Sequence, residues 1–385
     1  MRATFWMGRL AGIRIGVHWS VLVIFVLIAV GVAAGRLPDA HPGRPAWLYM
    51  LVGLITAVVF MFSLLAHEVS HAVVARRNGV GGDEITLWLL GGAARLKDEA
   101  PSPAAELRIA GVGPLASLVL GVVFALLAAL VGQVDGPGLL VEAMAWLAGI
   151  NVLLAVFNVL PAAPLDGGRL LRAVVWWRTG NRLRATAVAT GAGRLLGWLL
   201  IAVGLYLVLA GAAVDGVWLL LIGWFMVAMA SAEEGQAKLR ELLGAVPVRQ
   251  AMTADPVTVP AGTTVREFLS DPPWLYRHSA FPVTDPAGRA VGVVSVNQAG
   301  QVPVAERDST TVAAVMVPIE DIPTAAPDDP LFQLLPGIEA SPVRRALVVA
   351  EGRLAGIVTH SDISRVTTWL ASASPSGPDR PQAAR

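Results

Sequence analysis

Six long apolar stretches constrain the fold of this chain more than any other feature of the sequence. Each is about as long as the roughly 20 residues that an α-helix needs to cross a bilayer, and in lipid a helix satisfies its own backbone hydrogen bonds. Hydrophobic residues make up 55% of the chain and charged residues only 15%, a balance too apolar for a soluble globular protein. The sequence therefore predicts a polytopic α-helical membrane protein of about six spans within the lipid bilayer. The stretches cover residues 17–35, 46–75, 108–134, 139–160, 193–212 and 215–232.

The basic residues between these stretches are unevenly distributed. Loops on the side of the N-terminus hold most of the arginines, including Arg76 and Arg77, whereas the opposite side keeps only Arg36 and Arg44. Because cytosolic loops are enriched in lysine and arginine, we expect a multi-pass protein of the cell membrane with both termini in the cytosol. The net charge is only +1, so no nucleic-acid partner is expected.

The second apolar stretch contains the sequence His67-Glu68-Val-Ser-His71. On a helix, residues four apart share a face, so His67 and His71 can offer two imidazoles to one metal ion. Glu68 lies beside them, where it can accept a proton from water. Ionisable residues inside a membrane span are costly to bury and usually functional. The alternative is that these side chains only hold neighbouring helices together.

A metal site of this kind needs a third protein ligand. The chain has no cysteine, so the ligand must be His, Asp or Glu. The best candidate is Asp166, in the segment Asn158-Val-Leu-Pro-Ala-Ala-Pro-Leu-Asp166-Gly-Gly168, on the same side of the membrane as His71. Its prolines interrupt the helix, and its glycines allow a tight turn. Asp166 could also cap a helix over Gly167–Trp177, a role compatible with metal binding.

The C-terminal part of the chain contains an internal repeat at a constant offset of 64 residues. Met252 corresponds to Met316, and Gly292-Val-Val-Ser corresponds to Gly356-Ile-Val-Thr. A constant offset across several positions implies two copies of one small structural unit. Because short β-branched runs alternate with helical segments, we expect an α/β domain.

The histidine pair followed by Asn-x-x-Pro-x(3)-Leu-Asp-Gly-Gly resembles the site-two protease family of intramembrane zinc metalloproteases. The resemblance implies that His67, His71 and Asp166 bind one Zn²⁺ per subunit and that Glu68 is the general base. It also implies that Asn158 contacts the scissile carbonyl, although an asparagine can instead bond between helices. The implied substrates are single-span membrane proteins, such as an anti-sigma factor or a membrane-tethered transcription factor.

Two further segments match that family. Phe5–Trp19 and Leu87–Arg95 both read as short strands, and the resemblance implies a small membrane-associated β-sheet. An exposed strand edge could pair with an unwound substrate segment by β-augmentation. The alternative for the second segment is a simple turn between spans.

Each copy of the repeat resembles a cystathionine-β-synthase (CBS) motif. The second copy has the full pattern from Gly356 to Thr359 and Asp362, whereas the first has Gln298 where the family has Asp. The resemblance implies one adenine nucleotide site at Thr359 and Asp362, and regulation of the enzyme by the CBS pair. A dimerisation or scaffold module without a ligand, forming a homodimer through the CBS motifs, is an equal alternative.

These observations predict a metalloprotease unit followed by a CBS pair. A competing hypothesis is a membrane transporter or channel gated by the CBS pair. It explains the spans and the repeat, but it gives no reason for the histidine pair and the Leu-Asp-Gly-Gly sequence on one side of the membrane. The predicted boundaries are 1–232 for the metalloprotease domain, 233–244 for a linker, 245–306 and 307–371 for the CBS motifs, and 372–385 for a disordered tail.

Overall fold

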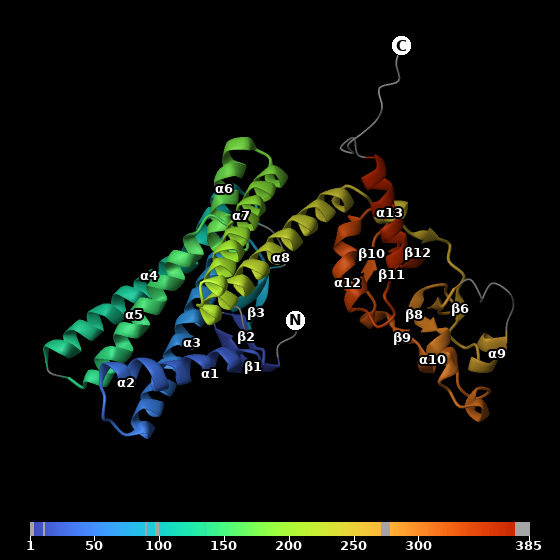
Figure 1. Ribbon diagram of the computed structural model, residues 1–385. Coiled ribbons are helices and arrows are strands. Elements are labelled where there is room, and N and C mark those ends of the chain that lie inside the picture. The colour runs from blue at the N-terminus through green and yellow to red at the C-terminus, as the bar shows by residue number, and fades with distance from the viewer. Residues whose placement is uncertain are drawn as a thin grey trace, which may run out of the picture. The chain divides into compact units, whose positions relative to one another are not determined.

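The computed structural model forms two compact units, Met1–Gly235 and Gln236–Arg385. The structure describes residues 4–10, 12–88, 91–96, 100–134, 136–270 and 278–373. Most of the predicted disordered tail therefore lies outside the described residues. The helices of the first unit and the small sheets of the second can be followed in Figure 1.

The first unit contains the predicted membrane spans. Within the described residues, six helices are long and apolar enough to cross a membrane. The first is built from α1 (Val21–Gly31), a π-helical turn at Val32–Arg36 and α2 (Leu37–Ala40). A shorter helix, α6 (Asp166–Thr179), lies between the fourth and fifth spans. The remaining spans are α3 (Ala46–Arg77), α4 (Pro103–Gln133), α5 (Gly138–Val159), α7 (Arg182–Leu209) and α8 (Ala213–Gly244).

Small residues allow these helices to approach closely, as is usual for helices in lipid. An added Cβ at Gly121 of α4 would lie 2.8 Å from a Val152 side-chain carbon of α5, and Figure 1 shows these two helices side by side. Gly204 of α7 and Gly216 of α8 face each other, because a Cβ on either would lie within 2.7 Å of the carbonyl oxygen of the other. Larger residues at these positions would force the helices apart.

The two segments predicted as strands belong to one four-stranded sheet in the order β1-β2-β3-β4, which also includes residues 82–86. Parallel pairing of β2 with β3 joins two antiparallel hairpins. The sheet packs against α3 through the buried residues Ile13, Ile85 and Ala72. The prediction of a small sheet beside the spans is confirmed, although Leu89 and Leu90 lie outside the described residues. The strands are β1 (Phe5–Leu10), β2 (Ile13–Val17), β3 (Gly82–Trp88) and β4 (Gly91–Leu96).

The second unit repeats one arrangement of strands and helices, as the offset of 64 residues predicts. The first copy contains β5 (Thr253–Ala254), β6 (Val259–Pro260), α9 (Val265–Ser270), β7 (Ala280–Thr284), β8 (Ala290–Ser295) and α10 (Val296–Gly300). The second contains α11 (Val312–Val315), β9 (Val317–Pro318), β10 (Thr324–Ala325), α12 (Leu335–Ala340), β11 (Arg345–Ala350), β12 (Arg353–Thr359) and α13 (His360–Ala373).

The two copies exchange their first strands. One sheet has the order β10-β11-β12-β5 and the other β6-β7-β8-β9, so β5 and β9 each complete the sheet of the other copy. The repeated methionines and glycines have a physical explanation in this exchange. A Cβ at Gly356 would lie 2.6 Å from the sulfur of Met252, and one at Gly292 would lie 2.7 Å from the sulfur of Met316. Each methionine therefore packs on the glycine of the other copy.

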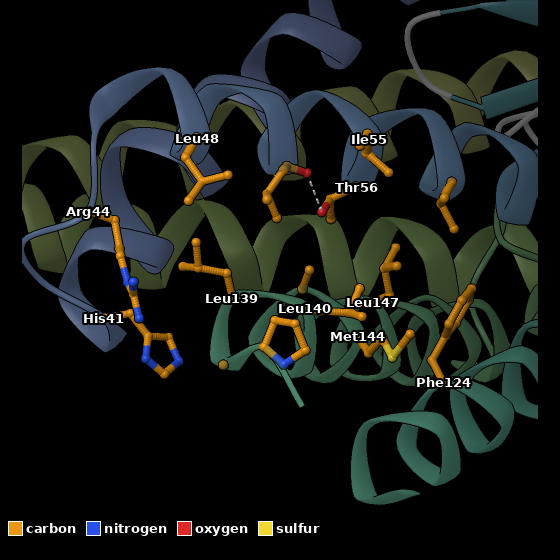
Figure 2. A pocket seen from close by; sticks show the side chains of 15 residues that line it. His41, Arg44, Leu48, Ile55, Thr56, Phe124, Leu139, Leu140, Met144 and Leu147 are labelled. Atoms are coloured by element: carbon orange, nitrogen blue, oxygen red, sulfur yellow. Dashed lines mark hydrogen bonds between the residues drawn. The ribbon is translucent and has the colours of Figure 1, made fainter. Parts of the chain in front are cut away.

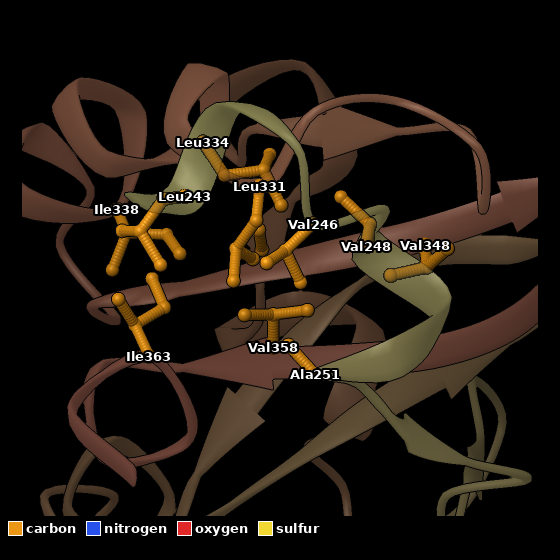
Figure 3. Packing of buried hydrophobic residues seen from close by; sticks show 11 residues of the cluster. Leu243, Val246, Val248, Ala251, Leu331, Leu334, Ile338, Val348, Val358 and Ile363 are labelled. Carbon is orange, nitrogen blue, oxygen red and sulfur yellow. The ribbon is translucent and has the colours of Figure 1, made fainter. Parts of the chain in front are cut away.

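The end of α8 belongs to the hydrophobic core of the second unit. Leu243 is fully buried there and packs with Leu331, Val358 and Ile363, as Figure 3 shows. Burial of one leucine side chain contributes about 1.5–3 kcal/mol. Residues 233–244, expected as a linker, thus form the last turns of a helix that begins in the first unit.

Candidate metal centre

Three predicted ligands converge at one point of the first unit. His67 and His71 lie on one face of α3, and Asp166 is the first residue of α6. The Oδ2 atom of Asp166 lies 3.3 Å from Nε2 of His67 and 3.1 Å from Nε2 of His71, and the two Nε2 atoms are 3.2 Å apart. Both histidines are buried. The ligand atoms all lie within 4.8 Å of one another, a spacing that one metal ion can bridge.

The outer nitrogen of each imidazole is held by α4. Nδ1 of His71 donates a hydrogen bond to the carbonyl oxygen of Ile109 at 2.6 Å. Nδ1 of His67 shares a hydrogen bond of 2.9 Å with the hydroxyl of Ser117. Such partners fix the orientation of a metal-binding histidine and leave its other nitrogen for the metal. Both bonds therefore direct Nε2 toward the shared centre.

Gly113 occupies the position between these two contacts on α4. A Cβ at this residue would lie 2.1 Å from Nε2 of His71 and 2.8 Å from Nε2 of His67. A side chain here would therefore collide with both imidazole rings, so a glycine at this position is what lets α4 approach them. Ile109, Gly113 and Ser117 are spaced four residues apart and share one face of the helix. Sequence analysis missed all three residues, although small residues four apart in an apolar helix, such as Gly113 and Ser117, are a usable signal.

Two glycines allow Asp166 to reach the histidines. An added Cβ at Gly167 would lie 2.1 Å from the carbonyl oxygen of Leu160, and one at Gly168 would lie 2.4 Å from the backbone nitrogen of Ala163. The start of α6 therefore packs directly on the preceding loop. Leu165 is the N-cap of this helix, so the alternative of Asp166 as the cap is wrong. The Asp166 side chain instead points to the two imidazoles.

The donor set fits zinc. Two imidazole nitrogens and one carboxylate oxygen are ligands that Zn²⁺ accepts in catalytic sites, where three protein ligands leave a further position for water or substrate. The three ligand atoms lie within 4.8 Å of one another, and α4 already orients both imidazoles, so one ion can be held between them. We conclude that His67, His71 and Asp166 can hold a zinc ion.

The two remaining candidate catalytic residues lie near the metal ligands in sequence. Glu68 follows His67 on α3 and is half-buried. Asn158 is half-buried near the end of α5, and its side-chain amide donates a hydrogen bond to the carbonyl oxygen of Leu154 in the same helix at 3.0 Å. The catalytic roles of both residues stay predictions.

A buried ion network supports α6 behind the metal ligands. Arg172 contacts Glu106 of α4, with Nε 2.7 Å from Oε1, and Glu233 of α8, with Nη1 2.9 Å from Oε1. Glu106 is fully buried, so its charge must be compensated by such a partner. Arg194 and Glu234 form a neighbouring pair between α7 and α8. Sequence analysis missed this network, because it considered the arginines between the spans only for their distribution across the membrane.

In the second unit, the predicted nucleotide-binding residues form a local hydrogen-bonded structure. Oδ2 of Asp362 accepts hydrogen bonds from the backbone nitrogen and the hydroxyl of Thr359, at 2.9 and 2.6 Å. Both residues line a cavity of about 490 Å³. In the first copy, Ser295 and Gln298 form the equivalent capping box and line a second cavity, of about 590 Å³. Gln298 therefore preserves the cap of the helix.

Comparisons with known proteins agree with this geometry. The profile of Peptidase family M50 matches residues 55–139 and 132–203, and that of the CBS domain matches residues 248–298 and 312–367. Rip3 of Mycobacterium tuberculosis is 43% identical over 376 residues, which cover 97% of this chain and 95% of that protein. Zinc metalloprotease MJ0392 of Methanocaldococcus jannaschii is 26% identical over 364 residues, which cover 94% and 95% of the two chains.

Among solved structures, the site-2 protease from Methanocaldococcus jannaschii matches with 27% identity and a TM-score of 0.40, covering 60% of this chain and 94% of that one. The alignment with metalloproteases over nearly the whole length disfavours the transporter hypothesis. The chain belongs to peptidase family M50 and is a multi-pass, site-2 protease-like zinc metalloprotease with a C-terminal pair of CBS domains.

Proposed function

We propose that this metalloprotease hydrolyses peptide bonds in or near the transmembrane segments of single-span membrane proteins. The observation that carries the proposal is the buried cluster of His67, His71 and Asp166, two of whose members lie inside a span of 32 residues. A hydrolytic centre at this depth has access to membrane segments rather than to soluble peptides. The expected substrates release a regulator, such as an anti-sigma factor or a membrane-tethered transcription factor.

The mechanism assigns one task to each side chain. Zinc held at this centre supplies Lewis acidity to the carbonyl and to water. The carboxylate of Glu68 accepts the proton of the attacking water and then gives it to the nitrogen of the leaving amine. The amide of Asn158 donates a hydrogen bond to the scissile carbonyl oxygen. Ser117 and Ile109 keep both imidazoles oriented throughout.

The four-stranded sheet provides a place for the substrate. A transmembrane helix hides its peptide bonds in its own hydrogen bonds, so it must unwind before it is cleaved. Among the described strands, β4 pairs only with β3 and lies next to α3, the helix of the histidine pair. Its free edge can pair with an unwound substrate segment by β-augmentation. The distribution of arginines supports a cytosolic position for this side of the unit.

The CBS pair regulates cleavage in this proposal, with an adenine nucleotide bound near Thr359 and Asp362. The support is α8, which is one continuous helix from Ala213 to Gly244. Its residue Leu243 lies in the core of the second unit, whereas Glu233 holds Arg172 on the helix that begins at Asp166. A movement of the CBS pair would therefore act on a helix that carries a metal ligand.

A reconstituted cleavage assay tests the proposed function. The full chain is placed in liposomes with a single-span substrate, and Glu68→Gln is compared with Glu241→Gln, which changes an exposed acid on α8. We expect Glu68→Gln to keep its zinc and to lose cleavage, while the control keeps both. Unchanged cleavage by Glu68→Gln would refute the assignment of the general base.

A further inference from the structure

A cavity of about 380 Å³ lies in the membrane unit, away from the metal centre along α3. Its walls come from the first half of α3 and from α5, with Phe124 contributed by α4. Thr56, in the wall, precedes His67 by about 16 Å along the helix axis, from a rise of 1.5 Å per residue. The cavity is therefore separate from the proteolytic site. Its volume lies in the range of about 300–1,000 Å³ that is usual for small-molecule sites.

The body of the cavity is apolar. Ile55 and Val59 of α3 face Met144 and Leu147 of α5 across it, as Figure 2 shows for the labelled residues. The hydroxyl of Thr56 is already bonded to the carbonyl oxygen of Val52 at 2.8 Å. This wall can therefore receive a hydrocarbon chain, whereas a polar molecule would find few partners there.

The polar groups gather at one end. Figure 2 shows His41 and Arg44 at the end of the cavity opposite to Phe124. Arg44 is exposed, and in the described part of the chain its guanidinium makes neither an ion pair nor a hydrogen bond. Arg36 is the other arginine near this end of the spans, and its Nε lies 2.5 Å from Oε1 of Glu142. Arg44 is thus available for an anion from outside the protein.

The position of Arg44 along the chain matches the height of lipid headgroups. It precedes the first residue of α3, Ala46, and Trp47 beside it is 66% exposed. Tryptophans at the ends of spans mark the boundary between the hydrocarbon and the headgroups. A cation at this boundary, above a cavity that runs inward between two spans, fits a molecule with an anionic head and an apolar tail.

We propose that this cavity binds an anionic phospholipid, with one acyl chain between α3 and α5 and the phosphate paired with Arg44. His41 lies beside the same headgroup and adds a hydrogen-bond donor. The bound lipid fills the space between the span that carries both histidine ligands and the span that ends near Asn158. This site does not depend on the chemistry of the metal centre.

Lipid retention by the purified full chain tests the proposal. The protein is delipidated in detergent, incubated with phosphatidylglycerol or phosphatidylcholine, washed, and analysed by native mass spectrometry. We expect one phosphatidylglycerol to remain bound and phosphatidylcholine to be lost, because its choline cation offsets the phosphate charge that faces Arg44. Arg44→Gln is expected to weaken phosphatidylglycerol binding about tenfold, the effect of losing roughly 1.4 kcal/mol from a charge-assisted contact. Arg36→Gln removes a charge near the same end of the spans and should have little effect.

A second variant separates a cavity site from binding to the general surface. Met144→Trp fills the cavity at a half-buried position, and Leu51→Trp adds the same side chain to α3 at a residue outside the lining. Only Met144→Trp should abolish retention, with zinc content as a check that both variants are folded. Equal retention of phosphatidylglycerol by Met144→Trp and the unmodified protein would overturn the proposal. So would equal retention of both lipids that is insensitive to Arg44→Gln.

Discussion

The metal centre and the candidate nucleotide site differ in what their polar atoms already bind. At the metal centre, α4 binds the outer nitrogens of His67 and His71, and the inner nitrogens face Asp166. At the CBS pair, Thr359 and Asp362 bind each other and cap a helix. The first arrangement brings ligand atoms from two helices to one point while a third helix orients them, as a metal ligand set requires, whereas the second is explained by the local structure of one helix start. A motif therefore indicates a binding site most strongly when neighbouring elements orient its atoms toward a common point.

The largest expected effect that tests this contrast concerns Gly113. Gly113→Ala places a methyl group against both Nε2 atoms, so we expect it to abolish stoichiometric zinc binding and cleavage together. Gly111→Ala is the matched control, because a Cβ there would meet its nearest heavy atom at an ordinary 3.8 Å. The zinc content of both purified variants tests this expectation. A Gly113→Ala protein that still binds one zinc ion per chain would show that the metal centre lies elsewhere.

The next effect concerns the ion network that supports α6. Arg172→Met leaves the buried carboxylate of Glu106 without its partner, and breaking such a pair costs about 3–5 kcal/mol. We expect a clear fall in the thermal stability of the membrane unit, measured in detergent. Arg36→Met breaks a more exposed pair with Glu142 in the same unit and should change stability by at most about 1 kcal/mol. Equal losses of thermal stability in the two variants would mean that the burial of Glu106 does not make its ion pair more costly to break.

A smaller effect is expected from the partner of one imidazole. Ser117→Ala removes the hydrogen bond to Nδ1 of His67, and loss of such a partner lowers metal affinity about 10–100-fold. Competition with a zinc chelator measures the change. Ser63→Ala is a control on α3, because within the described residues its hydroxyl donates its hydrogen bond to the carbonyl oxygen of Val59 in its own helix. An unchanged affinity in Ser117→Ala would contradict the orienting role of α4.

The smallest effect separates the two explanations of Asp362. Asp362→Ala removes a capping contact and should destabilise the second unit by about 0.5–2 kcal/mol, whether or not a nucleotide binds. Asp362→Gln should restore much of the cap, as Gln298 does in the first copy, while lacking the carboxylate. Calorimetry then measures the binding of AMP to this variant and to the unmodified chain. If Asp362→Gln is stable and still binds AMP as the unmodified chain does, the carboxylate is not a nucleotide ligand.

The parts of the fold that could be predicted follow from local patterns. The span lengths, the position of His67 and His71 on one helical face, and the repeat are each visible within one segment or from one offset. Asp166 lies far from the histidines in sequence, and the family motif connected it to them. Their prediction required no knowledge of how the helices are rotated against one another.

The parts that could not be predicted depend on packing between segments. Spans that are apolar on all sides do not reveal which face meets a neighbour, so the roles of Gly113 and Ser117 became visible only once α4 was placed against α3. The pairing of Arg172 with Glu106 and Glu233 joins three helices. The exchange of β5 and β9 likewise depends on tertiary contacts, although the repeat itself predicted two copies.

X-ray absorption at the zinc edge of the purified full chain tests the central claim most directly, because it reads the ligands themselves. The account predicts two imidazole nitrogens and oxygen ligands at about 2.0–2.2 Å, with one imidazole fewer in His71→Ala. A spectrum that shows a different number of imidazoles, or that is the same in His71→Ala as in the unmodified protein, would contradict the assignment of His67, His71 and Asp166 as the zinc ligands.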